Sequence, residues 1–126
     1  LLEQMSLLDL PGISWSPTTF EPTFDKWTGQ VCQGLVLEVT NAVTFRPYRT
    51  TLALIATVAS LWPEDFQWIL PPYEYETEKM PVDIVTGSDA VRQAIESGRL
   101  LDDLELLAEA NRDSWWDATA RARIYL

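Results

Sequence analysis

The chain has 126 residues, 47% of them hydrophobic and 22% charged, which is typical of one globular domain and not of a disordered segment. Its 19 acidic and 9 basic side chains give a net charge of −10, which argues against binding to nucleic acid or to an anionic membrane surface. With no histidine and one cysteine, the chain excludes histidine-dependent triads and an intrachain disulfide, and we expect no metal site and no cofactor.

The N-terminal region predicts the end of a helix followed by extended chain. Helix formers over residues 1–10 stop at a Pro-Gly pair, which is a strong breaker. Residues 13–24 alternate apolar and polar side chains, but Pro17 and Pro22 restrict them to an edge strand or an extended strap.

A glycine-bounded turn over residues 28–34 leads into the second extended stretch. Residues 35–41 alternate regularly and predict a half-buried strand. We expect one face of this strand to carry Leu35, Leu37 and Val39.

Residues 47–62 give the clearest helix signal. Pro47 suits the first helical position, where its missing N–H costs nothing, and Pro63 ends the helix. Two apolar stripes at helical spacing predict a central, largely buried helix, with Leu54 and Val58 in the core. The longest apolar run, residues 52–62, is about half the length of a membrane span, so no span is expected.

The C-terminal half predicts two further helices between two short strands. Residues 65–70 and 121–126 are strand candidates, and residues 88–98 form a helix that Ser88 can cap. A third helix is expected over residues 100–118 from its apolar stripe.

The order of these elements is mixed and does not alternate regularly between strand and helix. It therefore predicts a single α+β domain over residues 1–126, with a small mixed sheet covered by three to four helices.

The stretch PPYEYETEKMP, residues 71–81, concentrates carboxylates and phenols between prolines, and we call it the Tyr/Glu segment. An extended backbone would put alternate side chains on opposite faces. One face would carry Glu74, Glu76 and Glu78, and the other Tyr73 and Tyr75. A catalytic carboxylate pair, a ligand-contacting edge and a plain polar loop all fit this composition.

The six tryptophans divide by their setting in the sequence. Trp62 and Trp115 fall on apolar helical stripes and are expected in the core. Trp27 and Trp116 are the candidates for exposed rings that could stack on sugars or partners. The lone Cys32 is interpreted as a small packed side chain rather than a nucleophile.

Two arginines flank Pro47 at the start of the central helix. Arg46 and Arg49 could each hold a carboxylate bidentately, or pair with a neighbouring Asp or Glu.

Four segments in this order resemble the C-terminal part of the bacterial exo-β-N-acetylmuramidase family, formerly a domain of unknown function. They are TFEPTFDKWTGQVCQGLVLEVTN, TFRPYRTTLAL, PPYEYE and VDIVTGSDAVR, and the resemblance runs from about residue 11 to about residue 97. The chain departs from the family pattern at Asn41, where Asp is usual, and at Thr51, where Gly is usual.

The resemblance implies a part of a peptidoglycan-recycling enzyme that removes N-acetylmuramic acid from non-reducing ends. The family pairs a Rossmann-like N-terminal domain, carrying the catalytic acids, with a smaller C-terminal domain, and only the latter is matched here. We therefore expect no catalytic residue in this chain and no activity from it alone. Its expected partners are that catalytic domain and a muramic-acid-containing saccharide, in a periplasmic or secreted location.

The resemblance also points to residues that would contact the saccharide. The Tyr/Glu segment could offer hydrogen bonds to hydroxyls, and an arginine could bind the lactyl carboxylate. The expected substrate-binding residues are Tyr73, Glu74, Tyr75, Glu76 and Arg46.

Three functional hypotheses follow. The first is the accessory C-terminal domain of an exo-β-N-acetylmuramidase, which completes the substrate cleft and packs on the catalytic domain. The second is a non-catalytic structural or protein-interaction domain with exposed aromatic side chains. The third is a self-sufficient enzyme that uses the carboxylates of residues 74–78.

Overall fold

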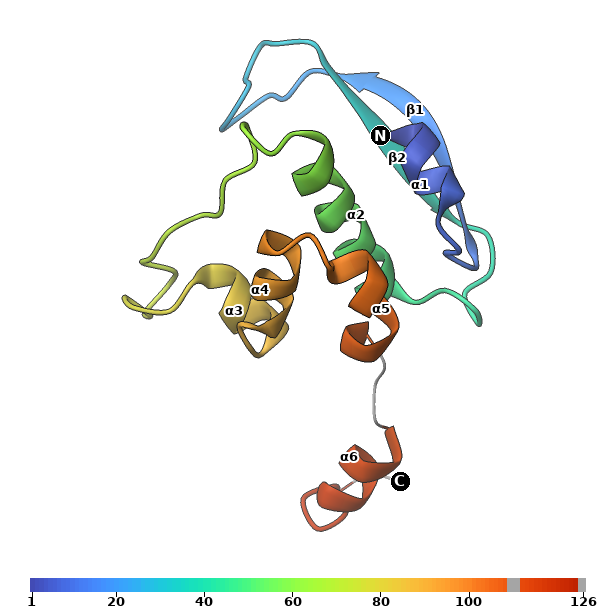
Figure 1. The fold of residues 1–126 in the computed structure, drawn as a ribbon, viewed down its shortest axis with the longest axis vertical. Coiled ribbons are helices and arrows are strands. Elements are labelled where there is room, and N and C mark those ends of the chain that lie inside the picture. The colour runs from blue at the N-terminus through green and yellow to red at the C-terminus, as the bar shows by residue number, and fades with distance from the viewer. Residues whose placement is uncertain (109–111, 125–126) are drawn as a thin grey trace.

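A computed structural model describes residues 1–108 and 112–124 (Figure 1). Within these ranges no helix is both long enough and apolar enough to span a bilayer. The elements follow in the order α1 (Leu2–Leu7), β1 (Ile13–Phe20), β2 (Cys32–Val39), α2 (Pro47–Leu61), α3 (Pro81–Thr86), α4 (Ala90–Glu96), α5 (Leu100–Ala108) and α6 (Arg112–Ala118). This content confirms the α+β class.

The sheet described here is a single antiparallel hairpin. β1 and β2 pair in one register, from Ile13 opposite Val39 to Phe20 opposite Cys32. The alternation seen in the sequence sets its two faces, since Trp15 and Leu35 pack against the helical core while intervening positions face outward. Of the two possibilities left open for residues 13–24, the strand is the one found, over Ile13–Phe20, and the strand predicted over residues 35–41 is confirmed within Cys32–Val39. Their pairing is purely antiparallel.

Gly12 joins the hairpin to the turn that precedes α2. Its φ is +78°, and its carbonyl accepts hydrogen bonds from the N–H groups of Thr40 (2.9 Å) and Asn41 (3.1 Å). A Cβ at this position would lie 2.5 Å from the carbonyl oxygen of Asn41. Only glycine fits this close backbone crossing, which holds the base of the hairpin against the start of α2.

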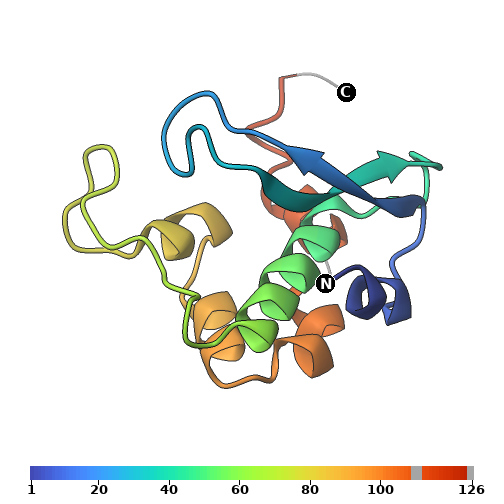
Figure 2. The same ribbon diagram turned by 90° about the horizontal axis from the view of Figure 1, so that it is seen from above.

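α2 runs through the centre of the molecule, with the hairpin as a layer on one side and α4 and α5 on the other (Figure 2). Its fully buried face holds Thr50, Leu52, Ala53, Ala56 and Thr57. The core that surrounds this face is completed by Met5, Leu10, Val91, Ala94, Ile95 and Leu104.

The predicted central helix is therefore confirmed, but its buried face is rotated from the expected one. Leu54 and Val58 are half-buried, whereas Leu52 is 2% exposed and Ala53 fully enclosed. Small residues at 53 and 56 let α4 and α5 approach closely, so this side of α2 becomes the core.

α3 was not foreseen from the sequence, although its end signals are clear. Pro81 occupies its first turn, and Gly87 ends it with a φ of +84°. α4 begins after three intervening residues, and its N-cap is Asp89 rather than the expected Ser88. The Ser88 hydroxyl accepts a long hydrogen bond of 3.4 Å from the Ala90 N–H.

Other expectations about the C-terminal half need correction. Residues 65–70 form no strand, and the helix expected over 100–118 is described as α5 and α6, with 109–111 outside the described residues. Residues 121–124 form turn and coil, while the last two residues of that strand candidate lie outside the described part.

The two tryptophans expected in the core are both exposed. Trp62 follows α2 and is 44% exposed, because the helix reaches beyond the neighbours that cover its middle. Trp115 is 59% exposed on α6, which lies apart from the other helices in Figure 1. The exposure expected for Trp27 and Trp116 is confirmed, at 65% and 56%.

Candidate functional site

The Tyr/Glu segment folds back on itself. The Tyr73 N–H donates to the Glu76 carbonyl at 2.9 Å, and the Glu76 N–H donates to the Tyr73 carbonyl at 3.0 Å. These reciprocal bonds close a tight turn with Glu74 and Tyr75 at its tip. The extended arrangement with three glutamates on one face is therefore wrong, because the turn reverses the chain between Glu74 and Glu76.

The tip of the turn presents its side chains to solvent. Tyr75 is fully exposed, and Tyr73 is 39% exposed. Glu74 adopts a φ of +52°, a backbone conformation that costs a non-glycine residue about 1–2 kcal/mol. Within the described residues the Glu74 carboxylate has no hydrogen bond or ion pair, so it is available to a ligand or another domain.

Glu76 has a different role from Glu74. Its Oε1 accepts hydrogen bonds from the backbone N–H groups of Glu78 (2.8 Å) and Lys79 (3.2 Å). These bonds, to Glu78 first and then to Lys79, lower the pKa of Glu76 below its ordinary value of 4.5. A group held ionised in this way is poorly suited to act as a general acid, and it braces the segment.

The two ends of the segment are tied to the helical body. On the N-terminal side, Phe66 and Trp68 pack edge to face with ring centres 4.8 Å apart, and Trp68 also contacts the core. On the C-terminal side the segment runs into α3 at Pro81, which is itself buried. The exposed tip therefore projects from two anchored ends.

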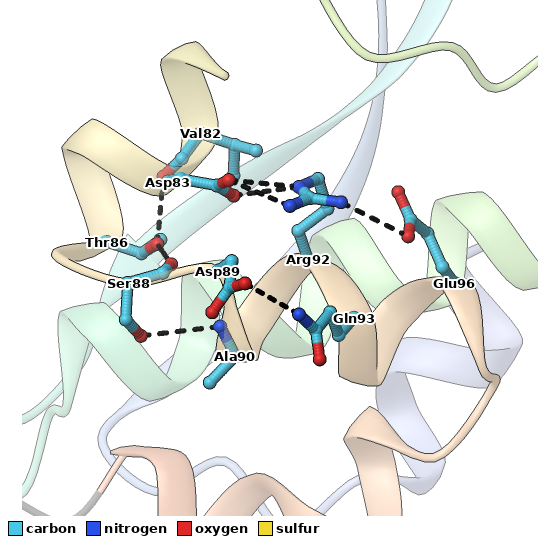
Figure 3. Close-up of polar contacts among 9 residues, drawn as sticks. All are labelled: Val82, Asp83, Thr86, Ser88, Asp89, Ala90, Arg92, Gln93 and Glu96. Atoms are coloured by element: carbon cyan, nitrogen blue, oxygen red, sulfur yellow. Dashed lines mark hydrogen bonds and ion pairs between the residues drawn. The ribbon is translucent and has the colours of Figure 1, made fainter. Parts of the chain in front are cut away.

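A hollow of about 510 Å³ lies beside the segment, between it and the α3–α4 turn. Its lining includes Glu76, Lys79, Asp83, Ser88 and Asp89. Most of its carboxylates already have partners, as Figure 3 shows for the α3–α4 side. Asp89 accepts a 2.6 Å hydrogen bond from the Gln93 side-chain amide.

The Arg92 guanidinium ties α3 to α4 across this turn (Figure 3). Its Nε and Nη2 each lie 2.9 Å from an oxygen of Asp83, and its Nη1 lies 3.4 Å from Glu96. The hydrogen bonds with Asp83 raise the pKa of Arg92 above its usual range. Asp83 is thus a structural anion on the wall of the hollow rather than a free base.

The arrangement offers contacts to a ligand but no paired acid and base. Glu76 and Asp83 are engaged as described, and among the described residues no group of His, Cys, Asp and Glu could hold a metal ion. Glu74, Tyr73 and Tyr75 remain as exposed groups that could accept from or donate to hydroxyls.

Arg46 is not brought to this site. It precedes α2, whose first turn lies on the other side of the molecule from the Tyr/Glu segment in both Figure 1 and Figure 2. Its guanidinium donates to the backbone carbonyls of Val43 (2.9 Å) and Phe45 (3.2 Å). It therefore braces the turn before α2, together with Asn41, whose Oδ1 accepts from the Val43 N–H.

The Asp83–Arg92 pair is the feature of this site that the sequence did not indicate. The two residues are nine positions apart and fall in separate helices, and the first of these helices was not expected. The proline at the start of α3 and the glycine after it were the signals that could have revealed the element.

Fold and site together define a small α+β module that presents a braced, exposed polar turn. Residues 1–125 match the family model described as "Exo-beta-N-acetylmuramidase NamZ, C-terminal". The chain therefore belongs to the family of NamZ C-terminal domains, and the match extends beyond residues 11–97 in both directions.

The chain is also similar to a curated bacterial enzyme. It is 32% identical over 104 residues to the peptidoglycan beta-N-acetylmuramidase NamZ of Bacillus subtilis (strain 168). The match covers 82% of this chain but only 23% of the relative, so the chain spans about a quarter of that protein's length. No solved structure matches the chain.

Proposed function

We propose that the chain is the accessory C-terminal module of a peptidoglycan exo-β-N-acetylmuramidase. In this proposal a separate, Rossmann-like N-terminal domain carries the catalytic acids, and the module packs on it and completes the substrate cleft. Membership of the NamZ C-terminal family and the similarity to one quarter of a peptidoglycan beta-N-acetylmuramidase support this role. The enzyme would act in cell-wall recycling on a muramic-acid-containing saccharide.

The observation that carries the proposal is the Glu74 carboxylate at the tip of a braced turn, which has no partner among the residues that the structure describes. The Glu76 carboxylate accepts hydrogen bonds from the backbone N–H groups of Glu78 and Lys79, just after the turn. The conformation of the tip is therefore stabilised without a contribution from the Glu74 side chain. A pre-shaped tip loses less conformational entropy when it contacts a ligand. In the cleft, Glu74 would accept from sugar hydroxyls, and the Tyr73 and Tyr75 phenols would donate to them.

In this proposal Arg46 is not a cleft residue, because its guanidinium donates to the backbone carbonyls of Val43 and Phe45 and so braces the turn before α2. If the lactyl carboxylate of muramic acid is bound by a cation, the catalytic domain would supply it. Glu76 contributes by shaping the turn rather than by touching the saccharide.

Kinetics of the complete enzyme test the proposal. Glu74→Gln and Tyr73→Phe should each lower kcat/KM for release of N-acetylmuramic acid from a chromogenic muramide by about tenfold or more. Glu78→Gln is the matched control, because Glu78 is an exposed carboxylate of the same segment without a side-chain partner in the described residues. It should leave kcat/KM within about twofold of the wild type.

Thermal unfolding separates a cleft residue from a structural one. An unchanged melting temperature with lost activity supports the cleft role of Glu74. A lowered melting temperature with normal kcat/KM would assign Glu74 to the stability of this domain and refute the proposal. The chain 1–126 assayed alone should release no N-acetylmuramic acid, and turnover abolished by Glu74→Gln would instead favour a self-sufficient enzyme.

Exposed aromatic side chains support one alternative, a non-catalytic protein-interaction module. Phe24 and Trp27 are 80% and 65% exposed in the loop between β1 and β2, and Trp115 is 59% exposed on α6. Rings of this size are common at the centres of protein interfaces. If Trp27→Ala abolishes a protein partnership while the Glu74→Gln enzyme remains fully active, this alternative replaces the cleft role.

A further inference from the structure

A second, larger hollow lies under the distal half of the hairpin. Its volume is about 740 Å³. The inner face of the hairpin forms one side through Pro17, Thr19 and Leu35, the end of α2 forms another through Trp62, and Leu1 and Leu2 close it. We call this hollow the hairpin groove.

The hairpin groove exists because the strands extend beyond the helices that cover them. Near the base of the hairpin, Ile13 and Trp15 pack on the core, whereas at its distal half Thr19 on the same face is exposed. Position 19 shares the parity of 13 and 15, so its side chain points toward the helical side. The inner face of the sheet is therefore only half covered.

The lining of the groove contrasts with the rest of this acidic chain. Although the net charge is −10, none of the described residues that line the groove has a charged side chain. The lining consists of aliphatic residues, one glycine, one tryptophan and neutral Thr and Gln side chains. Depletion of charge and a half-exposed aromatic ring are the marks of an interface centre. Trp62 is 44% exposed and would serve as the anchor.

The longer relative indicates which polypeptide would occupy the hairpin groove. The family model describes a C-terminal region, and the matched part is 23% of the Bacillus subtilis enzyme. Leu1 and Leu2 border the groove, so polypeptide that precedes this domain in a longer protein leaves directly from it. That polypeptide is already tethered at the groove, which gives it a high effective concentration there.

We propose that the hairpin groove is the seat on which the preceding catalytic domain docks, with Trp62 and the Pro17–Leu35 side of the hairpin buried in the contact. The inference rests on the proposed function, because it assigns the surface through which that module packs. It places the docking surface on the hairpin and leaves the Tyr/Glu segment free to face the substrate.

Thiol labelling of two engineered positions on one strand tests the docking. Thr19→Cys places a thiol in the groove, and Ser16→Cys places one on the outer face of β1, both in a Cys32→Ser background. In the complete protein, maleimide labelling at position 19 should be at least about tenfold slower than in the chain 1–126, while position 16 should react equally in both. Mass spectrometry of the labelled peptides reads each site separately.

A second pair of variants probes the same contact from the other direction. Thr19→Arg should speed proteolysis between the two domains of the complete protein by about tenfold, because it introduces a charge into a neutral contact. Ser16→Arg, on the outer face of the same strand, should not. Circular dichroism of both variants controls for the fold of the hairpin.

Equal labelling of position 19 in the complete protein and in the chain 1–126 would overturn the proposal. So would slow labelling of the chain 1–126 caused by a muramyl disaccharide alone, because the groove would then be a saccharide site. Neither the labelling nor the proteolysis experiment requires turnover, so both remain valid if Glu74 proves to have no role in the cleft. Conversely, if the docking proposal fails, the kinetic test of Glu74 remains valid.

Discussion

The centre of α2 and the Tyr/Glu segment are both well-defined parts of this domain, but different forces hold them. Leu52 and Ala53 are almost fully enclosed by α4, α5 and the N-terminal helix, so contacts between distant parts of the sequence fix them. The turn at Glu74 is fixed by hydrogen bonds between residues two to three positions apart, with its side chains in solvent.

This difference separates stability from recognition. In a region that is held by burial, the side chains are engaged in packing, because each apolar group stabilises the fold through its van der Waals contacts with neighbours. A region held by its own backbone and one bracing carboxylate leaves the remaining side chains free. Glu76 does the bracing, so Glu74 and the two tyrosines can be directed outward.

The largest expected effect comes from the buried side of this comparison. Leu52→Ala should destabilise the domain by about 2–5 kcal/mol, because it leaves a cavity among packed side chains. Leu54→Ala on the same helix should cost clearly less, since Leu54 is only half-buried. Denaturant unfolding of the chain 1–126 measures both, and equal losses would show that the two faces of α2 are not distinguished as described.

Substitution of Gly12 tests whether contacts between distant parts of the chain also determine stability at the base of the hairpin. Gly12→Ala should cost about 2–4 kcal/mol, because it combines a strained positive φ with a Cβ 2.5 Å from the Asn41 carbonyl oxygen. Gly29→Ala has a similar φ of +74° but meets no atom within 4 Å. It should cost only about 1–2 kcal/mol, which isolates the strain from the clash.

The difference between the two glycine variants is the informative quantity in urea or guanidinium titrations. If Gly29→Ala is as damaging as Gly12→Ala, the close approach of Gly12 to the turn at Asn41 contributes little. The hairpin would then be held mainly by its own strand pairing.

The smallest effect lies in the Tyr/Glu segment and depends on pH. The pKa of Glu76 is lowered in the folded chain, so its ionised form stabilises the turn fully above the ordinary value of 4.5. That stabilisation is lost as the pH falls through the lower folded-state pKa. The amide protons of Glu78 and Lys79, which donate to this carboxylate, should report the transition by NMR with a midpoint below 4.5.

Glu76→Gln is the control for this titration. It should remove the pH-dependent shifts of both amides while leaving the resonances of the α2 core unchanged. A midpoint at or above 4.5 in the wild type would mean that the carboxylate does not brace the turn in solution.

Elements with local signals could be predicted without coordinates. Alternation specified both strands, and the proline at position 47 together with apolar periodicity specified α2. The segments that match the family, including PPYEYE and VDIVTGSDAVR, were also readable without coordinates. These features depend on neighbours within a few residues, so one chain suffices to predict them.

Which surfaces are covered depends on the packing of elements that are distant in the sequence. Periodicity made two sides of α2 apolar but could not choose the one against which α4 and α5 pack, so Leu52 rather than Leu54 lies deepest. Periodicity also could not show that the Trp62 and Trp115 side chains are exposed. The reversal at Glu74 depends on reciprocal backbone bonds and on the Glu76 carboxylate, which composition does not encode. The burial of a residue depends on which elements from distant parts of the chain pack against it. A local sequence pattern indicates only whether a side chain is compatible with burial.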